Sequence, residues 1–429
     1  MKLRFIYPAF NRHAEDHPEL LDVVPCDEYF GPPSLGIASL AAVTPSSWDF
    51  DFRDDRFEDI GLDDDIDVVA ISTFTPSAKR AMEIADAFRA RGKQVVLGGV
   101  FPSNMPDVAA EHATVVVGEG DGIWPQVLVD AARGELLPRY EATELVDVNT
   151  LPLPRIDLYL DKECDAYRPS DYPVQQSRGC PMKCVACAIP NSLGRRLRPM
   201  PIEHIVGQVE QLAKRGKLAS LTEDTGLFPG APQRHTRTFV KALLDTGREA
   251  PVSYLGTSMP LILASDGALL DEMRASGIRM FYLVGGFDPI TRQAFNRQHP
   301  RQRQRAVDAI RKANDHGIEP YTSFLLGNDD DDEGSFDEML AVADEAGLKK
   351  AEFAIRTPYP GTSDWYEMVA QDRILHRDWS KYNDANVVFQ PAQMSPERLL
   401  QGYLDTWRGF YETRQSLSKL DARERTIQF

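Results

Sequence analysis

The chain has 429 residues, of which 42% are hydrophobic, and its formal net charge is −17. This length predicts two or three domains with sizeable cores. The acidic charge argues against a nucleic-acid partner or an anionic membrane surface, because phosphate groups would be repelled. No run of 18 or more apolar residues occurs, so we expect no membrane span. The first residues resemble a strand rather than a signal peptide, and a cytoplasmic location is therefore expected.

Strand and helix patterns alternate over residues 1–145, which is typical of a parallel α/β layer. The expected strands are Lys2–Tyr7, Val68–Ser72, Gln94–Leu97 and Thr114–Val117, and the expected helices are Ser34–Ala42, Ala78–Ala90 and Pro106–His112. Ligands of such sheets bind at the carboxyl ends of the strands. The pattern predicts an N-terminal Rossmann-like domain.

Residues 146–171 are rich in proline and lack periodicity, which indicates an interdomain linker. Strand and helix signals alternate again over residues 172–390 and predict a full or partial (βα) barrel. A C-terminal helical segment follows over residues 391–429, with an amphipathic helix expected at Ser395–Leu420 that packs on the protein rather than on a membrane.

The most informative motif is a cysteine triplet with the spacing CxxxCxxC, formed by Cys180, Cys184 and Cys187. Thiolates are soft ligands that suit zinc or iron–sulfur sites. A structural zinc ion takes four ligands from the protein, and the nearest histidine is His204. A cubane cluster held by three cysteines leaves one iron open to a substrate. The triplet therefore favours a [4Fe-4S] cluster, with structural zinc as the alternative.

The triplet and the barrel pattern after it resemble the radical SAM superfamily. The resemblance implies that the open iron chelates S-adenosylmethionine and that the cluster cleaves it into a radical. It further implies contacts to this cosubstrate at Glu223 and Asp224 for the amino group, at Gly285, Gly286 and Asp288 for the ribose, and at Leu326 near the adenine. Ala186 stands where the superfamily usually has an aromatic residue.

Small or flexible residues follow three successive strands of the N-terminal domain. They are Ser72, Thr73 and Phe74, then Gly98 and Gly99, then Gly118, Glu119 and Gly120. A bulky cofactor lying across the edge of the sheet would require such residues, although a Rossmann-like domain with glycine turns and no cofactor has them too.

Combined with the barrel, this layer resembles the cobalamin-dependent radical SAM branch, which includes C-methyltransferases and the anaerobic magnesium-protoporphyrin cyclase. The resemblance implies cobalamin as a further cofactor. The DxHxxG motif that gives cobalt an axial histidine is absent, and His13 is considered in its place beside the alternative of a solvated loop histidine.

We expect a C-methyltransferase that acts on an unactivated carbon of a small-molecule metabolite, with flavodoxin or ferredoxin as an external electron donor. A cyclase, oxidase or rearrangement enzyme with the same cofactors is the first alternative. A regulatory protein that senses redox state or cobalamin is the second, and it would not cleave S-adenosylmethionine.

Overall fold

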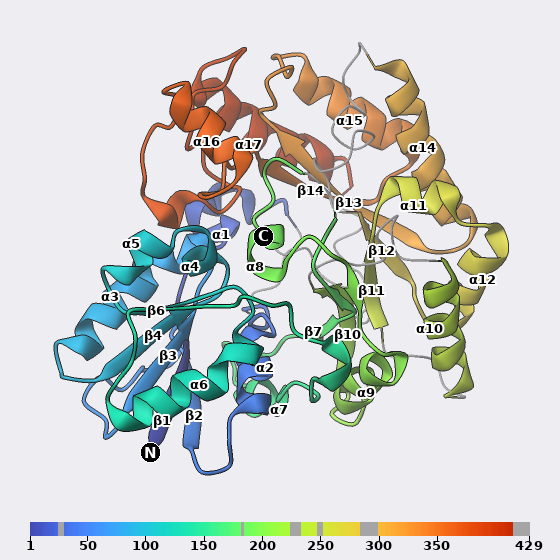
Figure 1. Ribbon diagram of the computed structural model, residues 1–429. Helices are drawn as coiled ribbons and strands as arrows, with labels where there is room; N and C mark the ends of the chain where they lie inside the picture. The colour runs from blue at the N-terminus through green and yellow to red at the C-terminus, as the bar shows by residue number, and fades with distance from the viewer. Residues whose placement is uncertain (25–29, 182–183, 224–232, 247–251, 284–298, 415–429) are drawn as a thin grey trace.

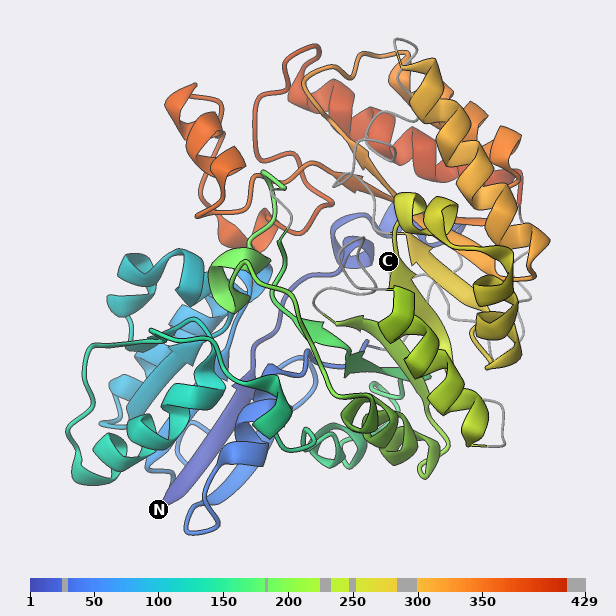
Figure 2. The same ribbon diagram turned by 45° about the vertical axis from the view of Figure 1, so that its right-hand side comes forward.

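The structure is a computed structural model and describes residues 1–24, 30–181, 184–223, 233–246, 252–283 and 299–414. Two parallel sheets of six strands form two lobes. Figures 1 and 2 both show the short helix α8 (Ile189–Leu193) between these lobes. The predicted α/β class is confirmed. Among the described residues, no helix is long and apolar enough to span a membrane.

The N-terminal lobe is built on a sheet with the strand order β2-β1-β3-β4-β5-β6, in which every described pair is parallel. Its strands are β1 (Lys2–Tyr7), β2 (Asp49–Asp54), β3 (Val68–Ser72), β4 (Gln94–Gly98), β5 (Thr114–Val117) and β6 (Arg139–Glu141). The strand order reverses next to β1, because β2 lies on one side of it and β3 on the other. Open α/β sheets bind ligands beyond the carboxyl ends of the strands at such a reversal.

Helices flank this sheet. They are α1 (His13–Asp16), α2 (Gly36–Val43), α3 (Ala78–Arg89), α4 (Val100–Asn104), α5 (Pro106–Ala110) and α6 (Gly120–Arg133), with the 3-10 turns η1 (Pro18–Leu20) and η2 (Thr75–Ser77). Helix α3 shows why the sequence forms this layer. Its buried residues Ala81, Ile84, Ala85 and Phe88 recur at helical spacing and face the sheet.

The linker is packed against the N-terminal lobe. It contains η3 (Val148–Thr150) and α7 (Asp157–Leu160). The Tyr159 side chain is fully buried, and its hydroxyl donates to the backbone oxygen of Ser34 at 2.7 Å. The same hydroxyl accepts a hydrogen bond from the backbone N–H of Ala38 at 3.2 Å. The linker is thus fixed to α2, while the four domain boundaries stay predictions.

The second sheet has the order β14-β13-β12-β11-β10-β7 and is also parallel throughout its described pairs. Its strands are β7 (Asp171–Gln175), β10 (Leu218–Glu223), β11 (Val252–Thr257), β12 (Met280–Leu283), β13 (Glu319–Leu326) and β14 (Lys350–Ile355). Within the described residues β7 and β14 are its two edges. The barrel is therefore a partial one.

Helices cover the outer face of this partial barrel. They are α9 (Ile202–Ala213), α10 (Gln233–Asp245), α11 (Met259–Ala264), α12 (Gly267–Ala275), α14 (Pro300–Asp315) and α15 (Ser335–Ala346). Three further elements lie outside the two large sheets. They are the antiparallel pair of β8 (Ser177–Arg178) and β9 (Arg198–Pro199), the helix α16 (Ser363–Ala370) and the 3-10 turn η4 (Trp379–Lys381).

The last described helix is α17 (Pro396–Glu412), which begins one residue after the expected start. The Ser395 hydroxyl caps it by accepting from the backbone N–H of Arg398 at 3.2 Å. Its side chains Leu399, Tyr403 and Trp407 have no exposed surface and join the core beside β14. This agrees with the expected packing helix, whose predicted final residues lie outside the described part of the chain.

Candidate functional site: a cavity beside a cysteine loop

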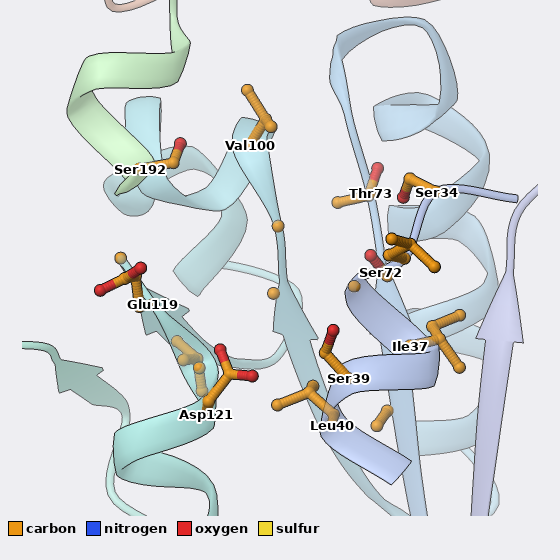
Figure 3. Close-up of a pocket in the computed structure, with 18 of the residues that line it drawn as sticks. Ser34, Ile37, Ser39, Leu40, Ser72, Thr73, Val100, Glu119, Asp121 and Ser192 are labelled. Atoms are coloured by element: carbon orange, nitrogen blue, oxygen red, sulfur yellow. The ribbon is translucent and has the colours of Figure 1, made fainter. Parts of the chain in front are cut away.

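A cavity of about 420 Å³ lies at the carboxyl edge of the N-terminal sheet. Figure 3 shows its walls, which come from the ends of the sheet strands, from α2 and α6, and from α8 of the second lobe. All eight residues that the sequence singled out at the strand ends line it, namely Ser72, Thr73, Phe74, Gly98, Gly99, Gly118, Glu119 and Gly120. The structure therefore brings the three predicted segments together around one space.

Two glycines of this wall lie close to neighbouring groups. Gly99 has a φ of +105°, and a Cβ atom there would lie 2.5 Å from the backbone oxygen of Thr73, so this position has no room for a side chain. A Cβ atom at Gly120 would lie 3.0 Å from Cδ2 of Leu40 on the facing helix, so a side chain there would require Leu40 to shift. Glycine at both positions therefore allows the close approach of the neighbouring groups.

The cysteine triplet lies on the loop between β8 and α8. Cys180 is buried, Cys184 and Cys187 are half-buried, and all three are free thiols. Desolvation raises the pKa of Cys187 to about 11, and the two neighbouring cysteines add to the shift. Among the described residues no group of three His, Cys, Asp or Glu side chains is arranged to hold a metal ion. The thiols share one loop without forming a closed ligand set.

Backbone contacts hold this loop near its start and in its middle. The N–H of Cys180 donates to the backbone oxygen of Gly194 at 3.0 Å, which closes the loop on itself. The N–H of Asp364, in the first turn of α16, donates to the backbone oxygen of Val185 at 3.0 Å. The loop is thus anchored to the C-terminal part of the barrel lobe.

A buried ionic network joins the loop to the cavity wall. Both terminal nitrogens of Arg198 donate to the Glu119 carboxylate, at 2.8 and 2.9 Å. Arg178 donates to Asp121 at 2.6 and 3.2 Å, and its contact with Glu119 is 3.5 Å long. All four side chains are at most 10% exposed. Sequence analysis proposed Glu119 as a cofactor contact but missed its arginine partners, which lie 59 and 79 positions away along the chain.

The pairing register gives the two faces of the barrel sheet different chemistry. Phe281, Phe324 and Phe353 are fully buried in the core beneath the covering helices. On the opposite, inner face the register pairs Tyr282 with Tyr321 and places Tyr254 and Glu352 on the same side of the neighbouring strands. The inner face is therefore aromatic and polar, where a buried barrel core would be aliphatic.

A carboxylate on the edge strand β14 belongs to that inner face. The hydroxyls of Tyr282 and Tyr321 donate to the two oxygens of Glu352, at 2.5 and 2.9 Å. Desolvation and the nearby Glu352 hold the pKa of both tyrosines well above the usual value, so both stay protonated donors. Desolvation likewise raises the pKa of Asp384 to about 6, and the Tyr359 hydroxyl donates to this carboxylate at 2.8 Å. The contacts of Glu352 were not predicted, although polar residues recur at every second position in the first part of β13 and β14.

The remaining predicted residues are less well defined by the structure. Glu223 ends β10, while Asp224, Gly285, Gly286 and Asp288 lie outside the described residues. The Leu326 side chain has no exposed surface, so only its backbone can face a ligand. Both ring nitrogens of His13 are engaged, with the backbone oxygen of Asn383 at 2.6 Å and with the Tyr403 hydroxyl at 3.2 Å. Desolvation lowers the pKa of His13 to about 4.

The fold and the site define an α/β protein in which a ligand cavity in a Rossmann-like lobe adjoins a cysteine loop at the mouth of a partial barrel. Two family models match the chain: the B12 binding domain over residues 29–128 and the radical SAM superfamily over residues 174–343. The first match contains the predicted strand-end residues, and the second contains the cysteine triplet.

Similar proteins agree with this pairing. The chain is 28% identical to the bacteriochlorophyllide d C-8(2)-methyltransferase of Chlorobaculum tepidum, over 87% of this chain and 86% of the relative. It is 27% identical to the C-12(1)-methyltransferase of the same organism, over 91% of this chain and 85% of the relative. The structure of the radical S-adenosylmethionine methyltransferase TsrM from Kitasatospora setae has the same fold, with a TM-score of 0.65 at 15% identity over 86% of this chain and 76% of TsrM. Its two matched domains are the pair that cobalamin-dependent radical SAM enzymes combine, and its sequence is similar to methyltransferases over most of the chain.

The residues present fit both cofactors of this family. Three cysteines on one loop supply the thiolate set of an iron–sulfur site with one open iron. On the cobalamin side, the buried hydroxyl of Ser192 on the cavity wall has no hydrogen-bond partner among the described residues. An unpaired buried hydroxyl on the wall of a cavity suits a cofactor that carries amide groups.

Proposed function

We propose that this chain methylates an unactivated carbon of a small-molecule metabolite, using S-adenosylmethionine, a [4Fe-4S] cluster and cobalamin. The observation that carries the proposal is the shared wall between the two sites. Helix α8 begins two residues after Cys187 and lines the cavity with Ile189, Ser192 and Leu193. The cluster loop and the cavity are therefore adjacent in space, as a reaction that uses both cofactors on one carbon requires.

When bound, the cluster supplies one electron to S-adenosylmethionine, and cobalamin carries the methyl group. The side chains of Cys180, Cys184 and Cys187 would hold the cluster. The strand-end residues from Ser72 to Gly120 would hold the corrinoid along the edge of the sheet. The contacts of Glu223, Asp224, Gly285, Gly286, Asp288 and Leu326 with S-adenosylmethionine stay part of the proposal. Because both nitrogens of His13 are engaged, we assign it no bond to cobalt.

The inner face of the barrel is the proposed location of the substrate. It lies on the same lobe as the cysteine loop, and its tyrosine and carboxylate groups can orient a polar molecule by hydrogen bonds. The two matched relatives from Chlorobaculum tepidum are named for a bacteriochlorophyllide, and the TsrM structure contains tryptophan. These names support a small-molecule substrate. An external electron donor such as flavodoxin or ferredoxin and a cytoplasmic location complete the proposal, both from sequence alone.

The test begins with anaerobic reconstitution with iron and sulfide in the presence of hydroxocobalamin. We expect iron and sulfide in the proportion of one [4Fe-4S] cluster per chain, retained corrinoid, and 5′-deoxyadenosine after reduction. S-adenosylmethionine with a deuterated methyl group is then supplied with bacteriochlorophyllide d or tryptophan as probe acceptors.

The outcomes separate the candidate functions. Transfer of the label to carbon supports methylation. Conversion of an acceptor without label supports a cyclase, oxidase or rearrangement enzyme instead. Iron without corrinoid removes transfer through cobalt, and zinc without iron contradicts the cluster assignment. Absence of 5′-deoxyadenosine from the fully loaded protein favours a regulatory role.

A further inference from the structure

Among the buried side-chain polar atoms that lack a hydrogen-bond partner in the described part of the chain, the Ser192 hydroxyl is the one on the cavity wall. The residue is 7% exposed, lines the cavity, and its Oγ atom has no hydrogen-bond partner among the described residues. Buried polar groups in proteins almost always have a partner, because burying one without a hydrogen bond costs free energy. Figure 3 shows Ser192 on α8, across the cavity from the helix that carries Ser39 and Leu40. A ligand in the cavity can supply the missing partner.

Ser192 lies on the helix that directly follows the cysteine triplet, so a contact with Ser192 can affect the position of the cysteines. Helix α8 (Ile189–Leu193) begins two residues after Cys187, the last cysteine of the triplet. The helix is fixed to the N-terminal lobe, because the Asn191 amide donates to the Asn104 side chain at 2.7 Å and the Asn104 amide donates to the backbone oxygen of Ala188 at 3.4 Å. A displacement of α8 therefore moves Cys187 relative to the cavity, and the reverse also holds.

The other end of the cysteine loop reaches the same cavity. Arg178 lines it and lies two positions before Cys180. The guanidinium donates to Asp121, which is also on the cavity wall, at 2.6 Å. Both ends of the loop thus touch the walls that a corrinoid would contact, although neither end belongs to the N-terminal lobe that forms the rest of the cavity.

We propose that Ser192 is a corrinoid-binding residue contributed by the cluster loop, and that through it the occupant of the cavity positions the cysteine triplet. The inference rests on the proposed function. A hydroxyl both donates and accepts, so Ser192 suits an amide of the corrin periphery or an oxygen of the nucleotide tail. Because one segment contacts both sites, we expect corrinoid to bind more tightly once the cluster is in place. Linkage then requires that bound corrinoid strengthens cluster binding by the same factor.

The experiment measures the dissociation constant of hydroxocobalamin for the full chain, without iron and after anaerobic reconstitution. Three variants are compared with the wild type: Ser192→Ala removes the hydroxyl, Ser192→Thr keeps it, and Ser39→Ala removes a hydroxyl from the cavity wall on α2, away from the loop. The ratio of the two dissociation constants is the coupling. A second readout is the electron paramagnetic resonance spectrum of the reduced cluster, with and without hydroxocobalamin.

We expect Ser192→Ala to weaken hydroxocobalamin binding to the reconstituted protein by about three- to tenfold, as for one lost hydrogen bond. Its coupling ratio and the spectral response to hydroxocobalamin should shrink together. Ser192→Thr should restore both, and Ser39→Ala should leave the ratio unchanged. A Ser192→Ala protein that binds like the wild type in both forms overturns the assignment, as does a Ser39→Ala protein that loses as much coupling.

Failure of the inference and failure of the proposed function look different in this experiment. A wild-type protein that binds hydroxocobalamin equally well with and without the cluster overturns the coupling and leaves the cobalamin assignment intact. A wild-type protein that takes up iron but binds no hydroxocobalamin overturns both.

Discussion

Replacing Glu119 by glutamine removes the charge that holds two arginines in the cavity wall and keeps the size of the side chain. In the wild type this carboxylate accepts hydrogen bonds from Arg198 at 2.8 and 2.9 Å and from the backbone N–H of Val146 at 2.8 Å. A glutamine has only one accepting oxygen, and its amide nitrogen would be directed at a guanidinium that also donates. The variant therefore leaves a buried positive charge without its partner.

The magnitude follows from the burial of the pair. The Glu119 side chain is 1% exposed and that of Arg198 is 10% exposed, so solvent screens their interaction weakly. Removing one partner of such a buried pair costs about 3–5 kcal/mol. We expect the lower part of this range, because Arg178 keeps Asp121 at 2.6 Å as a second partner.

The assay is the free energy of unfolding of the full chain in urea, with a surface pair as the control. Arg155 and Asp157 form a similar bidentate contact, with a shortest distance of 2.8 Å, but their side chains are 46% and 44% exposed. Asp157→Asn should cost less than about 1 kcal/mol. If Glu119→Gln is no more destabilising than Asp157→Asn, the network does not hold the loop to the cavity wall and the reasoning is refuted.

Three further predictions follow from the same structure. Cys184→Ala should lose its iron and all formation of 5′-deoxyadenosine with an unchanged circular dichroism spectrum; retained iron would contradict cluster ligation. Gly120→Val should place methyl groups against Leu40 and weaken hydroxocobalamin binding by about tenfold or more without changing iron content; unchanged affinity would remove the cavity as the corrinoid site. Burial raises the pKa of Asp331 from 3.8 to about 7, so its native carboxyl binds the proton more tightly than the unfolded chain does. Its contribution to stability is therefore fully present below pH 3.8 and lost as the pH rises through about 7, and Asp331→Asn should reduce the difference in melting temperature between about pH 5 and about pH 8.

The sequence predicted several strands of the N-terminal sheet and missed one in which acidic and aromatic residues alternate. Lys2–Tyr7, Val68–Ser72 and Thr114–Val117 are strands with the predicted bounds. The strand Asp49–Asp54 was missed because its sequence DFDFRD alternates acidic and aromatic residues. Its acidic residues are accommodated because Asp51 binds the buried Arg4 of the neighbouring strand at 2.6 Å, a pairing that only the folded sheet reveals.

The site residues that were predicted are those with a local signal in the sequence, and the missed ones depend on distant contacts. Small residues at strand ends and a cysteine spacing are local signals, and they led to the eight residues of the cavity wall and to the cysteine triplet. Arg198, Ser192 and Glu352 act through contacts with distant parts of the chain or through a face that depends on strand register. Such contacts depend on the folded structure and leave no local pattern in the sequence.

The docking of Tyr159 on α2 bears on how a methyl group can travel. A carrier domain that moves between two sites needs a flexible linker. Here the linker side chain Tyr159 is fully buried and makes two hydrogen bonds to the N-terminal lobe. Together with the hydrogen bonds between Asn104 and α8, it restricts how far the N-terminal lobe can move away from the cysteine loop. We therefore expect small shifts of α8 rather than a swing of the whole lobe, and an acceptor is selected partly by whether its reactive carbon reaches between the two cofactors.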